Sequence, residues 1–125
     1  MAYLNPQDRF QVQMRSMDEF IGKGNVVRFI DAFTERLELS KLGFVIPNEK
    51  TEGRPAFNPK VSLKLYFYGY LNGIRSSRKL EKEAIRNVEV HWLLAGLVPN
   101  YHTIADFRKN NPYALKATFK LFIFF

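Results

Sequence analysis

The sequence predicts an all-α fold: a compact multi-helix domain in which tight turns join consecutive helices into helix-turn-helix-like pairs. Apolar residues recur at helical spacing through most of the chain, and an alternating strand pattern never extends beyond a few residues. Glycine, asparagine and proline stand between the periodic segments, where they end one helix and begin the next. A chain of 125 residues has room for one domain with a modest single core.

We expect a flexible N-terminal arm, because residues 1–16 combine Pro6 with scattered polar groups and show no clear period. A helical domain then spans 17–125. Its first clear helix lies between Asn25 and Leu37, since Asn25 suits the N-cap position and apolar residues follow it at helical spacing. These apolar residues are Val26, Phe29, Ile30, Phe33 and Leu37.

A further helical turn should begin at Ser40 and end at Gly43, and the polar run NEKTEGRP predicts a loop or hinge near 47–58. Pro59 suits the first turn of a helix that reaches about Leu71, because the N–H that proline lacks would have no partner there. This helix has almost no polar face, so we place it at the centre of the core. Its apolar residues are Val61, Leu63, Leu65, Tyr66, Phe67, Tyr68, Tyr70 and Leu71.

The segment GYLNGIRSSRKLEKEAIR predicts two helices joined by a tight turn. Gly69 indicates a close helix crossing, and Asn72 with Gly73 ends the first helix because glycine adopts the left-handed conformation at little cost. Ser76 and Ser77 can cap the second helix, which carries an apolar and a basic stripe at i, i+4 spacing. The apolar stripe is Leu80, Ala84 and Val88, and the basic stripe is Arg78, Lys82 and Arg86.

Two shorter segments follow the basic helix. Residues 88–95 predict a short helix that ends at Gly96, and 97–100 form a second tight connection. Thr103 and Asp106 stand three residues apart, as in a close variant of the capping box, so we expect the next helix to start at Thr103.

The helix from Thr103 should stop at Asn110, after which Asn111 can cap a final helix with Pro112 in its first turn. That helix ends in the apolar sequence LFIFF. Neither this run, over 115–125, nor the run over 61–71 reaches the roughly 20 residues that a membrane span needs, and both contain lysine. We therefore expect no membrane association.

The composition and the N-terminal sequence indicate where the protein is located and which sites it lacks. The chain contains no cysteine, which excludes disulfides, thiolate catalysis and zinc sites built on sulfur. The opening sequence MAYLNPQDRF lacks a basic leader followed by an apolar core, so we expect no signal peptide and a cytoplasmic location. The net charge of +7 is uneven: residues 1–52 hold seven Lys/Arg against eight Asp/Glu, whereas 53–125 hold twelve against four. The second half is where a polyanion would bind.

Catalysis and metal binding find little support. The two histidines, His91 and His102, have no serine clearly paired with either and no companion carboxylate at ligand spacing, so we expect no catalytic residue, metal or other cofactor. We interpret His91 as a packed helix residue and His102 as a turn residue or polar contact. Paired acids on helices are interpreted as solvated faces; these pairs are Asp31 with Glu35 and Glu81 with Glu83.

Binding to double-stranded DNA has better support. Like charges four residues apart destabilise an isolated helix by about 0.2–0.5 kcal/mol per pair. The three cations of the basic stripe have this spacing, which suggests a surface that binds an anion. The candidate phosphate contacts are Arg75, Arg78, Lys79, Lys82, Arg86, Arg108 and Lys109, the last two following a helix N-terminus that could itself bind phosphate. Seven contacts give a salt slope of roughly −6. A solvated basic helix is the alternative.

Which helix enters the major groove stays open, because the turns at Gly73 and at 97–100 each define a helix pair. The helix that begins near Tyr101 offers polar groups, His102 and Thr103, at the end where base contacts are usually made. The longer basic helix is better suited to the phosphate backbone.

The chain resembles the N-terminal domain of bacterial insertion-sequence transposases of the DDE type. The resemblance covers most of the chain, and three blocks carry it in order. The first is Asp18-Glu19-Phe20 with NVVRFIDAF and LELSKLGF, the second is GRPAFNP with LKLYFYGYLNGIRSSRKLE, and the third is HWLLAGLVPNYHTIADFRKNN. The resemblance implies a helical domain that precedes the catalytic domain and helps to bind the terminal inverted repeats of the element.

In that family an RNase H-like domain follows, with three acidic residues that hold divalent metal. This sequence stops at Phe125 before any residue that could match them, so Asp31, Glu89 and Asp106 are not given that role. We therefore expect a truncated, remnant or split-frame product that binds DNA without catalytic activity of its own. Two alternatives stay open: a helical module for dimerisation or for docking to a separate catalytic transposase chain, and a helix-turn-helix regulator.

Overall fold

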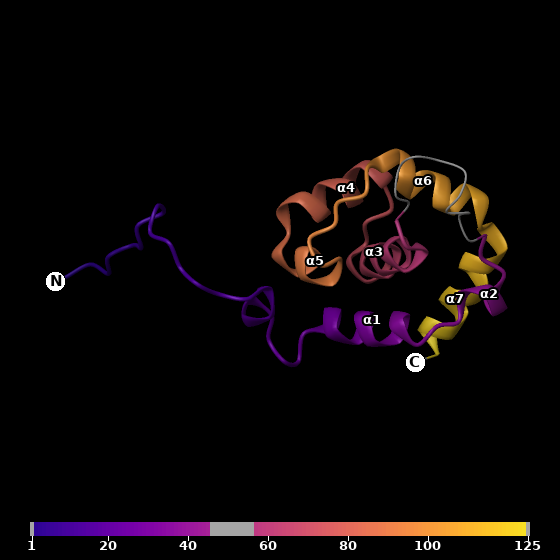
Figure 1. Cartoon of the computed structure of the whole chain (residues 1–125), viewed down its shortest axis with the longest axis horizontal. Helices are drawn as coiled ribbons and strands as arrows, with labels where there is room; N and C mark the ends of the chain where they lie inside the picture. Colours follow the sequence, from indigo (N-terminus) through magenta and orange to yellow (C-terminus); the bar gives the residue numbers. More distant parts are fainter. Residues whose placement is uncertain (1, 46–56, 125) are drawn as a thin grey trace.

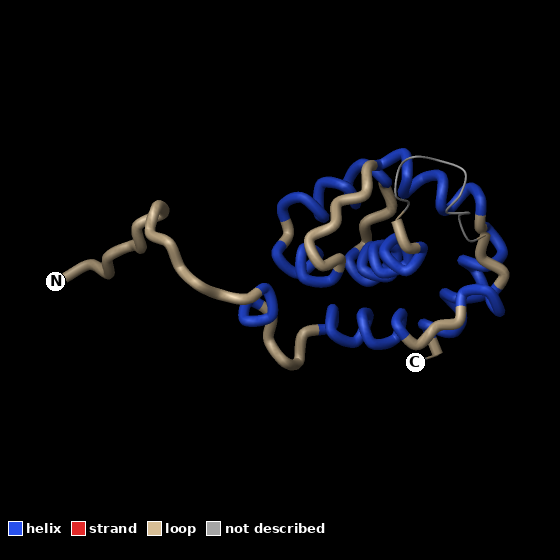
Figure 2. The backbone as a smooth tube through the Cα atoms, in the orientation of Figure 1, coloured by secondary structure: helices blue, strands red, loops and turns tan. Residues whose placement is uncertain are grey.

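The computed structural model describes residues 2–45 and 57–124, and all regular structure in that part of the chain is helical (Figures 1 and 2). The absence of strands from the described residues confirms the all-α class. The predicted loop or hinge near 47–58 lies outside these residues, apart from Phe57 and Asn58. The elements are a 3-10 helix η1 (Met17–Phe20) and the α-helices α1 (Val26–Glu35), α2 (Leu39–Leu42), α3 (Pro59–Asn72), α4 (Ser77–Arg86), α5 (Val88–Leu93), α6 (Tyr101–Asn110) and α7 (Pro112–Ile123).

Helix α3 is the centre of the core, as its apolar sequence predicts. Every residue from 61 to 69 is buried, and in Figure 1 α3 lies between α1 on one side and α4 and α6 on the other. The helix begins where expected: Pro59 occupies the first turn, and the Asn58 side chain accepts a hydrogen bond from the Lys60 N–H at 2.9 Å. Tyr70 and Leu71, at its C-terminal end, are exposed.

An aromatic cluster holds α1, α3 and α7 together. Phe67 of α3 stacks on Phe122 of α7 with ring centroids 4.3 Å apart, and Phe33 of α1 meets both rings edge-on at 5.6 and 5.3 Å. Aromatic pairs of this kind contribute about 0.5–1.5 kcal/mol each beyond the area that they bury. The C-terminal helix is therefore an integral part of the core.

The tight turn after α3 forms as the glycine pattern predicts. Gly73 adopts the left-handed conformation, with φ of +71°, and the Ile74 N–H donates to the Gly69 carbonyl at 2.8 Å. A Cβ on Gly69 would lie 2.6 Å from the Ile74 carbonyl oxygen and 3.0 Å from Cδ2 of Leu80. Close packing at Gly69 is therefore observed, but its nearest neighbour is the backbone of the following turn and not the crossing helix that the sequence predicts.

Helix α4 begins as predicted but ends earlier than its apolar stripe suggests. The Ser76 side chain caps it by accepting from the Lys79 N–H at 3.4 Å, and Leu80 and Ala84 are buried. The extension of the stripe to Val88 is wrong, because the chain turns at Asn87 and leaves Val88 49% exposed.

Asparagine side chains decide the other helix starts. Asn25 caps α1 as predicted, accepting from the Val27 N–H at 3.0 Å. The start predicted at Thr103 is wrong: α6 begins at Tyr101, because the Asn100 side chain accepts from the Thr103 N–H at 2.9 Å and makes Asn100 the N-cap. Asn111 precedes α7 as predicted, but its buried side chain makes no cap.

The Asn111 side chain instead connects two parts of the chain. Its oxygen accepts from the Val45 N–H at 2.8 Å, and its nitrogen donates to the Phe107 carbonyl at 3.0 Å. The short helix α2 ends at Gly43 as predicted, with a left-handed φ of +87°. No helix of the described residues is long and apolar enough to cross a membrane.

Residues 2–16 contain no helix, and all of them are exposed. In Figure 1 this arm leads away from the helices, starting from η1. Its base is fixed by Arg28 of α1, which donates to the Asp18 carboxylate at 2.9 Å and to the Ile21 carbonyl at 2.8 Å. Trp92 of α5 also donates to the Asp18 carboxylate, at 3.1 Å, so η1 is held against α1 and α5.

Candidate nucleic-acid interface

Helices α4 and α6 pack side by side in opposite directions. Arg108, near the end of α6, donates to the carbonyl of Arg75 just before α4, at 3.3 Å. At the other end of α6, the Tyr101 N–H donates to the Glu81 carboxylate of α4 at 2.9 Å. The Arg78 guanidinium also lies over the Tyr101 ring, 4.3 Å from its centroid. These contacts bring together two basic segments that are separated in the sequence by α5.

All nine predicted site residues lie on this helix pair or in the turn before α4. All are exposed except Thr103, which is half-buried. On α4 and in the turn before it are Arg75, Arg78, Lys79, Lys82 and Arg86, and on α6 are His102, Thr103, Arg108 and Lys109. We call the surface formed by these residues the α4–α6 surface.

One member of the predicted basic stripe is neutralised. Arg86 pairs with Glu83 one turn earlier, with Nη2 2.6 Å and Nε 3.0 Å from the same carboxylate oxygen. Glu83 is buried, and Asn87 donates to its other oxygen at 2.8 Å. Hydrogen bonds from Asn87 and Arg86 lower the pKa of the Glu83 carboxyl. Arg86 is therefore committed to closing the end of α4, so it contributes less to an anion site than the stripe suggests.

The remaining cations divide into two groups. The side chains of Arg75, Lys79, Lys82 and Lys109 make no hydrogen bond or ion pair within the described residues, so a phosphate can meet them directly. The guanidinium groups of Arg78 and Arg108 instead lie over aromatic rings, the second over Tyr66 at 5.0 Å from the centroid. A cation held over a ring keeps its charge, so six cations of the α4–α6 surface lack a carboxylate partner.

The N-terminus of α6 is less open to an anion than the sequence suggests. The N–H groups of Tyr101 and Thr103 already donate to Glu81 and Asn100. Arg108 and Lys109 lie in the last turn of α6, at the opposite end of the helix. The N-terminus of α6 and these two cations therefore lie at opposite ends of the helix, and phosphate binding by either of them stays a prediction.

At the same end of α6, two rings form a small exposed platform. The imidazole of His102 lies 4.0 Å from the Tyr101 ring, centroid to centroid, and His102 is exposed. The sequence drew attention to His102 and Thr103 but missed the role of Tyr101, which joins Arg78 to α6. Only a contact between distant segments shows that role.

Residues considered for chemistry have structural roles instead. Asp31 and Glu35 are not simply solvated, because both carboxylates bind the Lys64 ammonium of α3 at 2.7 Å. Burial opposes the charge of Lys64, but the hydrogen bonds that its ammonium donates to the two carboxylates outweigh this effect and raise the pKa of Lys64. His91 is exposed on α5, so the interpretation as a packed residue is wrong. Glu81 and Glu83 are likewise engaged, with Tyr101 and with Arg86.

Within the described residues, no three His, Asp or Glu side chains lie close enough together to hold a metal ion.

A comparison with known protein families gives a match. The family model described as transposase domain (DUF772) matches residues 15–110, which include η1 and helices α1 to α6 and thus the whole α4–α6 surface. No curated protein matches the chain significantly. No solved structure does so either.

Proposed function

The chain belongs to the transposase domain (DUF772) family, and from this premise we propose that it binds the double-stranded DNA of transposon ends, as an N-terminal domain of a DDE-type transposase does. The observation that supports this proposal is the α4–α6 surface. Two helices from separate parts of the chain pack against each other, and these helices with the turn before α4 carry six cations without carboxylate partners. A surface of this kind is the electrostatic footprint of a nucleic-acid partner.

Helix α4 is proposed to hold the phosphate backbone. Lys79 and Lys82 lie three residues apart on it and are exposed, so both can reach neighbouring phosphates of one strand. Arg78 adds charge from a position that the Tyr101 ring fixes, which lowers the entropy lost when it meets a phosphate. These contacts orient the domain on DNA without reading its sequence.

Helix α6 is proposed to supply the base contacts. His102 is exposed in its first turn, next to the half-buried Thr103, and imidazole and hydroxyl groups both donate and accept hydrogen bonds at base edges. Since α6 runs antiparallel to α4, its N-terminal end lies beside the middle of α4, at Glu81 and Arg78. The backbone contacts of α4 would then set which bases His102 can reach.

Six phosphate contacts correspond to a salt slope of about −5, because each contact contributes about −0.9 by counterion release. This value is smaller than the roughly −6 expected for all seven cations, since Arg86 is paired with Glu83. The affinity should fall by about 10³ between 50 and 200 mM salt.

Fluorescence anisotropy of a labelled duplex that carries the terminal inverted repeat tests this proposal. The double variant Lys79→Glu/Lys82→Glu should lower the affinity by at least about 60-fold at 0.1 M KCl, the effect of two lost contacts. The control Lys23→Glu/Arg36→Glu changes the net charge equally at exposed positions outside the α4–α6 surface, and should bind nearly as the natural chain does. An equal loss of affinity in both variants would show that binding depends only on the net charge of the chain. No loss of affinity in either variant would refute the proposal.

Base reading by α6 has a separate test. His102→Ala should bind the repeat and a scrambled duplex with similar affinity, while the salt slope stays unchanged because no phosphate contact is lost. A variant that retains full preference for the repeat would show that His102 does not read bases.

We also propose that this chain binds DNA without cleaving it. In support, the described residues hold no cluster that would bind the catalytic metal of a DDE transposase. Incubation with supercoiled plasmid carrying the repeat in Mg²⁺ or Mn²⁺ should leave the plasmid intact. Nicks at the end of the repeat would overturn this part of the proposal.

A further inference from the structure

The N-terminal arm presents apolar side chains that nothing covers. Phe10, Val12 and Met14 are 92%, 90% and 97% exposed, and they alternate with polar residues. Phe10 lies in a turn that the Gln11 N–H closes by donating to the Asp8 carbonyl at 3.2 Å, and Val12 and Met14 follow this turn as alternate residues. We call these three exposed side chains the apolar edge of the arm. The Gln13 side chain donates to that of Gln7 at 3.2 Å and so spans this turn.

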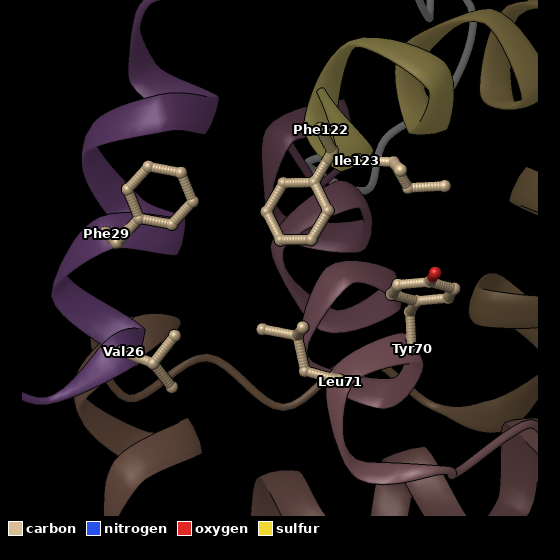
Figure 3. A pocket seen from close by; sticks show the side chains of 6 residues that line it. All are labelled: Val26, Phe29, Tyr70, Leu71, Phe122 and Ile123. Atoms are coloured by element: carbon tan, nitrogen blue, oxygen red, sulfur yellow. The ribbon is translucent and has the colours of Figure 1, made fainter. Parts of the chain in front are cut away.

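The helical body presents a matching surface, an apolar groove where α1, α3 and α7 meet (Figure 3). Its lining residues are Val26, Phe29, Tyr70, Leu71, Phe122 and Ile123. Apart from Phe122, each of these side chains is 40–57% exposed. We call this surface the α1–α3–α7 groove. It carries no charged side chain, so it suits an apolar segment better than a polyanion.

The arm of the same chain leads away from the helices that form this groove (Figure 1). Arg28 donates to Gly22, Ile21 and Asp18 at 2.8 to 3.0 Å, and Trp92 fixes Asp18 from the other side. These bonds fix the point where the arm leaves the body. In Figure 1 the arm starts from η1, near the N-terminal end of α1, and points away from the C-terminal end of α7, which forms part of the groove.

We propose that the arm of one copy packs its apolar edge into the α1–α3–α7 groove of a second copy, and that the second arm does the same in return. A reciprocal exchange is closed by a two-fold axis, so it stops at the dimer. Phe10 buries about 150 Å² and Val12 and Met14 about 100 Å² each, so two arms with matching area on the grooves bury roughly 1,400 Å² in total. Specific interfaces bury about 1,200–2,000 Å².

Sedimentation velocity measures the dimer directly. At micromolar concentration, the sedimentation coefficient should correspond to a dimer, which has twice the monomer mass of 14.7 kDa. The variant Phe10→Ser/Val12→Ser/Met14→Ser should be monomeric, with an unchanged melting temperature because these side chains contact nothing in the body. The control Gln11→Ser/Gln13→Ser changes the polar edge of the same arm and should still dimerise. A triple variant that dimerises like the natural chain would overturn the proposal, as would a monomeric natural chain at 100 µM.

Cross-linking shows which groove the arm enters. Because the chain contains no cysteine, Val12→Cys and Leu71→Cys can be introduced singly, the second on a chain with an added tag that changes its mass. When a mixture of the two single variants is oxidised, one tagged and one untagged chain should become linked by a disulfide. The mass of this pair lies between those of a pair of untagged chains and a pair of tagged chains. A chain that carries both Val12→Cys and Leu71→Cys is the second sample. If this double variant forms a disulfide within one chain and the mixture of single variants forms none, the arm folds back on its own groove and the exchange is refuted.

Discussion

Replacing Gly69 by alanine should destabilise the domain, although alanine is the better helix former. Helix propensity alone would stabilise the variant by up to about 1 kcal/mol. The new Cβ would lie 2.6 Å from the Ile74 carbonyl oxygen, which is backbone and cannot rotate away, and 3.0 Å from the buried Leu80 side chain. Overpacking costs of about 1–3 kcal/mol are typical of such contacts.

A central value of about 2 kcal/mol for this overpacking leaves a net loss of about 1 kcal/mol after the helix gain. For a domain of 125 residues, that loss lowers the melting temperature by roughly 4 °C. The turn around Gly73 cannot relax easily, because the Ile74 N–H is bonded to the Gly69 carbonyl at 2.8 Å. Strain at Gly69 should therefore appear as lost stability.

Thermal unfolding followed by circular dichroism at 222 nm measures this change. The control is Gly24→Ala, since a Cβ on Gly24 would meet nothing within 4 Å and its φ is not positive. The control should melt at or slightly above the temperature of the natural chain. If Gly69→Ala raises the melting temperature instead, the approach of α3 to the following turn is not as close as described, and the reasoning from the Ile74 oxygen is refuted.

Three further predictions concern side chains that hold α3, α4 and α6 in place. Glu83→Gln should reduce the loss of stability that the natural chain shows as the pH falls. The pKa of Glu83 in the folded state lies below its ordinary value of 4.5. The ionised carboxylate therefore stabilises the fold above pH 4.5, and this stabilisation is lost as the pH falls through the folded pKa. The melting temperatures of the natural chain and this variant should thus differ most near neutral pH and converge in acid. Asn87→Ala should cost about 0.5–2 kcal/mol in urea unfolding, because it removes the cap of α5, whereas Asn110→Ala, at an exposed position, should stay within about 0.5 kcal/mol. Tyr66→Phe should cost about 1–3 kcal/mol in the same assay, because the buried Ile104 carbonyl loses the hydroxyl that donates to it. An unchanged unfolding midpoint for Tyr66→Phe would contradict that bond.

Local signals in the sequence were sufficient for most helix ends. Asn25, Pro59 and Gly73 act within one turn of themselves, so their residue types alone predict the boundary. The errors at Asn87 and Asn100 have the same physical origin. Each asparagine accepts a backbone N–H two or three residues later and so sets the boundary, at Asn87 despite an apolar period that continues to 88 and at Asn100 in place of Thr103.

The candidate site was predictable as a set of residues but not as a surface. The spacing of Arg78 and Lys82 shows that they share a face of one helix, but it does not show that α6 lies beside that helix. The decisive contacts join residues 20 and 33 positions apart, Tyr101 with Glu81 and Arg108 with Arg75. The pairing of Arg86 with Glu83 could be predicted from the sequence, since Glu83 stands three residues before Arg86. The burial of Glu83, which the sequence does not show, explains why this carboxylate keeps Arg86 as its partner.

The two proposed interfaces occupy different faces of the molecule. In Figure 1, α4 and α6 lie on one side of α3 and α1 lies on the other. The groove shares no lining residue with the α4–α6 surface, so an arm in the groove would leave the cations free. A dimer would carry two such surfaces, and linking two binding modules makes the second contact intramolecular. The triple variant in the arm should therefore bind a duplex with one repeat as tightly as the natural chain. It should lose the added affinity for a DNA molecule that carries two repeats, and equal losses on both DNAs would show that the arm contacts DNA itself.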